Sequence, residues 1–183
     1  MREARYLIDR METIEQDLKP ALKKASAAFR RWYAFTDVIY LPPGVSGELL
    51  NARYVRWRIT HATGQDWPVI TVTDKKIVWR GDVKEDIILF RREFDAAQPA
   101  IDFVDASYGW EKQFAFSRTG TEYALGTLRI FVEDILVPGI RWSVEIEGPD
   151  ETAIAACSRM LGLGDPIRDS VPSLVYRHTC AQR

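Results

Sequence analysis

The sequence is poor in the residues that most zinc and redox sites use. It contains two cysteines and two histidines among 183 residues. Cys157 and Cys180 fit no zinc-knuckle or CxxC spacing, so we interpret them as a reduced core thiol and a tail thiol. His61 and His178 alone are too few for a histidine-rich metal site. These absences exclude zinc fingers, dithiol redox centres and histidine-rich metal centres.

Long apolar runs and an excess of one charge are also missing. No segment approaches the about 18 uninterrupted apolar residues of a membrane helix, and residues 1–5 include an acid where a signal peptide would be basic. The 25 basic and 26 acidic side chains give a net charge of -1, which argues against a uniformly basic nucleic-acid-binding surface. We therefore expect a cytoplasmic protein that binds neither membranes nor nucleic acid.

The apolar content is high enough for one sizeable core, since 46% of the residues are hydrophobic and 11% aromatic. There is no internal repeat, low-complexity run or linker. We expect a single domain over residues 1–183, with its core at about 1–164. The tail, 165–183, is expected to be irregular, with Val171, Leu174, Val175 and Tyr176 packed on the body.

Helical periodicity is present in three segments. Apolar residues recur at spacings of three and four over residues 11–31, which predicts an amphipathic helix. Pro20 interrupts this segment, so we expect a kink or a restart near Leu18. Two further helices are predicted over residues 95–106 and 151–161.

Most of the remaining chain consists of short segments rich in β-branched and aromatic residues. The expected strands are 4–8, 32–41, 52–60, 69–73, 86–94, 110–117, 128–135 and 140–147. Turn-prone stretches at 63–66, 80–82 and 118–120 separate several of them. This arrangement predicts an α+β fold, in which helices flank a mainly antiparallel, barrel-like sheet.

Charged residues alternate with apolar residues inside the expected strands. Over residues 52–60, Arg56 and Arg58 share the face opposite Trp57, and over 140–147, Glu145 and Glu147 share the face opposite the apolar residues. Lys75 continues the alternation of strand 69–73. One face of the sheet is therefore expected to be apolar, and the other to be a lattice of Arg, Lys and Glu.

This charged lattice has two interpretations. On an open sheet it is a solvated face whose cross-strand ion pairs contribute about 0–1 kcal/mol each. In a closed barrel it lines the lumen, where like charges must be compensated by each other or by a ligand. Because Arg and Lys neutralise phosphate oxygens and paired carboxylates hold Mg²⁺ or Mn²⁺, such a lumen suits a polyanion with divalent metals.

Four motifs carry a resemblance to a known family. EARYLI (3–8), YVRWR (54–58), VTDK (72–75) and VEIEG (144–148) occur in the order, and at roughly the spacing, of the CYTH superfamily. That superfamily includes triphosphate tunnel metalloenzymes, class IV adenylate cyclases and thiamine triphosphatases. The resemblance implies an eight-stranded antiparallel β-barrel, or triphosphate tunnel, whose charged interior binds a triphosphate-containing small molecule with Mg²⁺ or Mn²⁺.

The resemblance also implies roles for individual residues. The triphosphate would be gripped by Arg5, Arg56, Arg58, Lys75 and Lys112. The metal would be held by Glu3, Glu145 and Glu147, and the catalytic residues would be Glu3, Lys75 and Glu145. The sequence departs from the family pattern at three positions: the first acid falls on Met1, the N-terminal lysine is Arg5, and a second basic residue after Lys112 is Phe114.

The sequence does not decide which residues of the middle strands match the family's mid-chain positions. Either Lys84-Glu85-Asp86 or Arg92-Glu93 supplies the mid-chain basic and acidic positions. In the strand 128–135, Glu133 aligns with the family's acid and Asp134 is its neighbour.

Two functions follow from the resemblance. The first is a metal-dependent enzyme that hydrolyses the phosphoanhydride of a nucleoside triphosphate, inorganic triphosphate or thiamine triphosphate, or that cyclises ATP. The alternative is a non-catalytic nucleotide- or polyphosphate-binding module of the same fold. A barrel with only a structural or interaction role remains a third interpretation, and a homodimer is compatible with all three.

Overall fold

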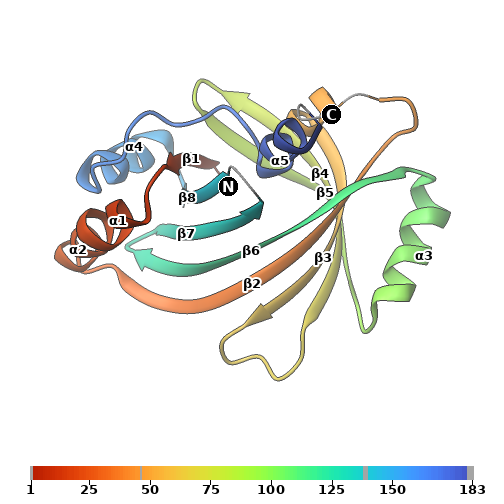
Figure 1. Ribbon diagram of the computed structural model, residues 1–183, viewed down its shortest axis with the longest axis horizontal. Helices are drawn as coiled ribbons and strands as arrows, with labels where there is room; N and C mark the ends of the chain where they lie inside the picture. The colour runs from red at the N-terminus through yellow and green to blue at the C-terminus, as the bar shows by residue number, and fades with distance from the viewer. Residues whose placement is uncertain (1, 46, 138–139, 181–183) are drawn as a thin grey trace.

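The computed structural model describes residues 2–45, 47–137 and 140–180. Within these ranges, eight strands close into an antiparallel barrel in the order β1-β5-β4-β3-β2-β6-β7-β8 (Figure 1). The strands are β1 (Arg2–Ile8), β2 (Ala28–Leu41), β3 (Arg53–Ala62), β4 (Val69–Arg80), β5 (Val83–Phe94), β6 (Glu111–Leu125), β7 (Leu128–Val137) and β8 (Ile140–Gly148). The predicted α+β barrel is therefore confirmed.

The strands are longer than the sequence patterns predict, and one expected turn is wrong. Residues 118–120 lie inside β6, where they pair with both β2 and β7. Gly120 sits where a Cβ atom would lie 2.8 Å from the hydroxyl oxygen of Tyr33. This glycine therefore permits a close approach of side chain to backbone, and it does not mark a turn.

The first helical region is shorter than the predicted 11–31 segment. It consists of α1 (Met11–Thr13), the π-helix η1 (Ile14–Leu18) and α2 (Lys19–Lys24), so the irregularity expected near Leu18 is a π-helical stretch. Pro20 lies in the first turn of α2, where a missing N–H is tolerated. The chain then turns through Ser26, whose φ is +59°, and enters β2 at Ala28.

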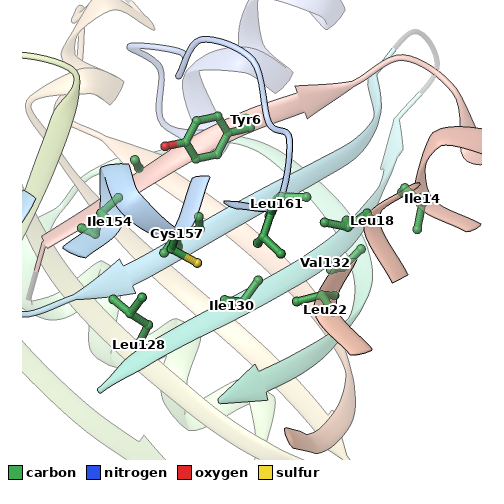
Figure 2. Close-up of a cluster of buried hydrophobic side chains, with 13 residues drawn as sticks. Tyr6, Ile14, Leu18, Leu22, Leu128, Ile130, Val132, Ile154, Cys157 and Leu161 are labelled. Atoms are coloured by element: carbon green, nitrogen blue, oxygen red, sulfur yellow. The ribbon is translucent and has the colours of Figure 1, made fainter. Parts of the chain in front are cut away.

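Helices cover the outer, apolar face of the barrel. The region α1–α2 and helix α4 (Glu151–Met160) lie on one side, and α3 (Ala97–Tyr108) lies on the opposite side (Figure 1). Figure 2 shows Leu22 and Cys157 packed over Ile130 of β7. Cys157 is a buried thiol, as expected, and burial raises its pKa to about 11. It is therefore a packing residue.

The C-terminal tail is not irregular, because it contains helix α5 (Val171–Cys180). Val171, Leu174 and Val175 are buried, as predicted for this tail. They pack against residues on the inward face of the barrel, among them Ile39 and Phe116, and Leu50 of the short 3-10 helix η2 (Gly47–Asn51) joins the same cluster. Helix α5 thus closes one end of the barrel. None of the described helices is long and apolar enough to cross a membrane.

Candidate functional site

The inward face of the barrel lines a cavity of about 600 Å³. Its lining is dominated by charge, as expected for a closed sheet with alternating faces. Nine basic and seven acidic side chains contribute: Arg5, Arg31, Arg56, Arg58, Lys75, Lys84, Arg91, Arg118 and Arg129, with Glu3, Asp37, Asp86, Glu93, Glu133, Glu145 and Glu147. A chain with a net charge of -1 therefore carries a cavity in which basic side chains are in excess.

Arg56 and Arg58 meet at a carboxylate that the sequence did not single out. They lie two residues apart on β3, and β3 pairs with β2 so that Arg58 faces Asp37. Arg58 donates to both Asp37 oxygens, at 2.5 and 2.7 Å, while Arg56 lies 3.7 Å from one of them. Burial alone would raise the pKa of Asp37, but Arg58 and Arg56 lower it. Burial and neighbouring Arg56 lower the pKa of Arg58 to about 10, so it remains a cation at neutral pH.

A second buried network is centred on Glu133 of β7. Arg5 and Arg118 each donate to Glu133 at 2.7 Å, and the Tyr33 hydroxyl donates to it at 2.8 Å. Burial would raise the pKa of Glu133, but the two guanidinium groups outweigh burial and hold it at about 2. Glu133, and not Asp134, is therefore the acidic residue of β7 that lines the cavity.

The three predicted metal ligands come together. Strand β1 pairs with β8 so that Glu3 lies opposite Glu147, with Glu145 two residues further along β8. One carboxylate oxygen from each of the three lies within 4.8 Å of the others. Three oxygen donors would fit a hard divalent cation such as Mg²⁺ or Mn²⁺, and such a cation would supply charge neutralisation at this place.

Each carboxylate of this trio also has a basic partner. Lys84 pairs with Glu3, Arg5 pairs with Glu145, and Arg129 lies 2.8 Å from Glu147. Burial would raise the pKa of Glu3, but Lys84 and Lys75 lower it. In contrast, burial and the neighbouring Glu3 raise the pKa of Glu147. The trio is thus held together by cations that a metal ion would replace in part.

The structure resolves the register of β5. Lys84 and Asp86 line the cavity, and so do Arg91 and Glu93. Both sets face inward because the pairing of β5 with β4 shifts between Asp74 and Lys75, which leaves Leu89 as an extra residue. Glu85 and Arg92 belong to the outer face. Lys75 pairs with Asp86 across these two strands.

Lys112 is not part of the cavity, which corrects its expected role in triphosphate binding. It is exposed at the start of β6 and is absent from the described cavity lining. The β2–β6 pairing shifts at this point, from Ile39 with Phe114 to Tyr40 with Lys112. Phe114, which stands where the family pattern has a second basic residue, packs beside Phe116 and Tyr176 at the closed end.

Several cavity residues were missed in the sequence. Arg118 was assigned to a turn, and Asp37 is a single charge within an aromatic strand. Arg129 is the second residue of β7, where too few strand residues precede it for an alternation of charged and apolar side chains to be recognised. Met1, at which the first acid of the N-terminal motif falls, lies outside the described residues.

The cavity retains donors that nothing among the described residues satisfies. The buried Nε–H groups of Arg5, Arg56 and Arg118 have no hydrogen-bond partner in the part of the chain that the structure describes. Buried polar groups are nearly always paired with protein, solvent or ligand. These three guanidinium groups therefore have spare capacity for an anion.

No family model and no curated protein matches the chain. Solved structures do match. A conserved hypothetical protein from Pyrococcus furiosus is 20% identical over 96% of this chain and 100% of its own, with a TM-score of 0.72. The PH1819 protein from Pyrococcus horikoshii OT3 is 15% identical over 99% of both chains, with a TM-score of 0.71.

A third match is the candidate adenylyl cyclase HpAC1 from Hippeastrum, which is described as having a dominant triphosphatase activity. It is 10% identical over 95% of this chain and 94% of its own, with a TM-score of 0.69. At such identities the likeness concerns the fold alone. The chain shares with these proteins the closed, eight-stranded antiparallel barrel that its sequence motifs predict.

Proposed function

We propose that this protein hydrolyses the phosphoanhydride of a triphosphate with the help of Mg²⁺ or Mn²⁺. The observation that carries the proposal is the meeting, in one cavity, of an acidic trio and a group of buried guanidinium groups. Phosphoryl transfer requires positioning of the chain of phosphates and neutralisation of its charge, and little covalent chemistry from the protein.

The basic side chains would hold the phosphates. Arg56 is best suited, because its contact with Asp37 is long, at 3.7 Å, and its Nε–H is unsatisfied among the described residues. Arg58 is fixed in place by its two bonds to Asp37. Arg5 and Lys75, which line the cavity from β1 and β4, would complete the grip, and a cation such as Lys75 would stabilise charge that develops on the phosphates.

Glu3, Glu145 and Glu147 would hold the metal. A divalent cation supplies charge neutralisation and Lewis acidity to the phosphate oxygens that it contacts. Lys84, Arg5 and Arg129 now pair with the same carboxylates. Once those carboxylates have another partner, the three basic side chains become available to phosphate oxygens.

The cavity lining also contains neutral side chains, which favour a substrate with an organic group. They include Phe35, Thr60, Gln65, Val69 and Thr71, from β2, β3 and β4 and the turn between β3 and β4. Such side chains add nothing to the binding of an inorganic triphosphate, whereas a nucleoside or thiamine group would pack against them. We therefore favour a nucleoside or thiamine triphosphate over inorganic triphosphate.

The second candidate is a binding module that does not turn its ligand over. It is favoured by the ion pairs on all three carboxylates of the trio, since a module that holds a triphosphate through basic residues alone would keep those pairs. Metal dependence separates the two candidates.

Calorimetric titration of ATP, thiamine triphosphate and tripolyphosphate, with Mg²⁺, with Mn²⁺ and with chelator, is the first test. Phosphate, pyrophosphate and cyclic AMP are then measured in the same mixtures. We expect metal-dependent binding and phosphate release, both lost in Glu145→Gln and retained in the control Lys112→Ala. Binding without turnover would support the module, and no binding of any of the three would reject both candidates.

A further inference from the structure

A second hollow adjoins the cavity at the end of the barrel away from α5. It has a volume of about 450 Å³ and is lined by residues of β2, β6, β7 and the turn between β6 and β7. Arg31 and Arg129 line this hollow and also line the cavity. These two arginines therefore stand where the two spaces meet, at the mouth of the cavity.

Charges of alternating sign form a row across four neighbouring strands at this mouth. Arg31 of β2 lies opposite Glu122 of β6, and Arg129 of β7 lies opposite Glu147 of β8. Arg31 donates through Nε to one oxygen of Glu122 at 2.7 Å, and Arg129 donates through Nε to the other at 2.9 Å. Arg129 also donates to Glu147 at 2.8 Å. Glu122 therefore holds both arginines with one carboxylate, beside the acidic trio.

Glu122 is a buried carboxylate that the phosphate and metal assignments leave without a role. It is 7% exposed. Burial would raise its pKa, but the hydrogen bonds from Arg129 and Arg31 lower it, so the carboxylate is ionised at neutral pH. Because Glu122 takes only the Nε–H of Arg31, both Nη groups of Arg31 lack a hydrogen-bond partner among the described residues. These groups are the ones with which a guanidinium binds phosphate oxygens.

A β-bulge in β2 brings a third arginine to the same hollow. The β2–β6 pairing shifts between Phe29, opposite Tyr123, and Arg31, opposite Glu122, which leaves Arg30 as an extra residue. Arg30 is exposed and lines the hollow, but it is absent from the described cavity lining. Arg30 and Arg31 thus carry the same charge at neighbouring positions, and Glu122 holds only Arg31 of the two.

We propose that Arg31 and Arg129, positioned by Glu122, form an anion subsite at the mouth of the cavity for one phosphate group. This group belongs either to the bound triphosphate or to released inorganic phosphate, and the choice of ligand rests on the proposed function. Glu122 does not touch the phosphate and acts through the two arginines. When Glu147 has another partner, Arg129 keeps its bond to Glu122 and its stacking on Phe131, whose ring centre lies 4.8 Å from the guanidinium carbon. Glu122 thus keeps Arg129 in place for the phosphate.

Removal of Glu122 separates positioning from simple electrostatics. An acid beside an anion site repels the anion, so charge alone predicts that Glu122→Ala binds phosphate groups more tightly. Positioning predicts the opposite sign, because the two arginines lose the carboxylate that orients them. We expect the affinity of Glu122→Ala to fall about tenfold. Glu122→Gln keeps one acceptor oxygen and should lie between Glu122→Ala and the wild type.

The neighbouring arginines supply a matched pair of variants. Arg31→Ala should weaken binding about tenfold or more, because it removes charge-assisted hydrogen bonds. Arg30→Ala removes the same charge one residue away and should weaken binding by less than about threefold. The double variant Glu122→Ala/Arg31→Ala should lose less affinity than the product of the two single losses, because Glu122 acts partly through Arg31.

Calorimetric titrations with tripolyphosphate and with inorganic phosphate, each with Mg²⁺, give the affinities, and circular dichroism establishes that each variant is folded. A loss for tripolyphosphate alone identifies a phosphate of the substrate, and a loss for inorganic phosphate as well identifies the released one. The proposal is overturned if Glu122→Ala binds both anions as tightly as the wild type or more tightly. Equal losses for Arg30→Ala and Arg31→Ala would also overturn it, as would a wild type that binds neither anion.

Turnover plays no part in these comparisons. A wild type that binds tripolyphosphate but releases no phosphate would reject the proposed hydrolysis, whereas the subsite would still be judged by the affinities of the variants. Failure of the subsite and failure of the proposed function are therefore separate results.

Discussion

The inward-facing side chains are charged at one end of the barrel and apolar at the other. On β2 the inward side chain changes from Asp37 to Ile39, and on β7 from Glu133 to Ile135, each within two residues. The same step occurs on three further strands, from Arg118 to Phe116, from Lys75 to Ile77 and from Arg56 to Tyr54. On these five strands the inward side chains therefore change from charged to apolar at the same level of the barrel.

This boundary shows that strand alternation does not by itself determine what a face becomes. On the apolar side, α5 covers the inward residues and turns them into a core. On the charged side, the inward residues are balanced by one another and leave a cavity. The two halves should therefore respond differently to substitution, to acid and to ligand.

The largest expected effect is on ligand binding at the charged end. Arg56→Ala/Arg58→Ala removes two guanidinium groups that would each contribute charge-assisted hydrogen bonds to phosphate. We expect the affinity for tripolyphosphate, measured by calorimetry with Mn²⁺, to fall roughly 10²- to 10⁴-fold. Lys112→Ala, on an exposed lysine outside the cavity, should bind like the wild type. Equal affinities for the double variant and the control would show that the arginines do not hold phosphate.

The apolar end should instead respond in stability. Leu174→Ala truncates a buried side chain of α5 and is expected to lower the free energy of unfolding by about 2–5 kcal/mol. Urea denaturation measures this change. The control Arg177→Ala, on an exposed face of the same helix, should cost about 1 kcal/mol or less. Similar losses for both variants would mean that α5 does not contribute a core.

Acid should destabilise the charged end alone. The folded-state pKa of Glu133 is about 2, below its ordinary value of 4.5. Its contribution is therefore fully present above pH 4.5 and is lost as the pH falls from 4.5 towards 2. Asp37 and Glu3 act in the same direction. Urea unfolding between pH 7 and pH 3 should show this slope, and Glu133→Gln should reduce it, whereas Glu12→Gln, on an exposed side chain, should retain it.

The smallest effect is expected close to the charged networks. Gly120→Ala would place a Cβ atom 2.8 Å from the Tyr33 hydroxyl oxygen and from the carbonyl oxygen of Val132. Such overpacking is expected to cost about 1–3 kcal/mol in urea denaturation. Gly164→Ala is the matched control, since nothing lies within 4 Å of the added atom. Equal free energies of unfolding for the two variants would show that the packing of Tyr33 against residue 120 does not depend on glycine.

The parts of the fold that follow from regular alternation could be predicted. Arg56, Arg58, Glu145 and Glu147 lie on uninterrupted strands, and their inward placement follows from the period of two. Lys112 and the two halves of β5 could not be placed, because a shift in strand pairing reverses the face of every residue beyond it. Such shifts depend on the neighbouring strand and leave no local signal.

Long-range pairing explains the other misses. Asp37 becomes important only because the β2–β3 register sets it opposite Arg58. The apolar residues of α5 were expected to pack on the body, but its helical form was missed. Short helices are stabilised mainly by tertiary contacts, and these contacts come from β2, β6 and β7.

The closure of one end by α5 has a consequence for longer substrates. Because α5 closes one end of the barrel, a polyphosphate would enter the cavity terminus first from the other end, and any further phosphates would extend outward through the same mouth. Under the proposed function, the enzyme would cleave such chains from the end and spare their internal bonds. Shortening of a long polyphosphate should therefore release small products from the start, with no accumulation of mid-length fragments.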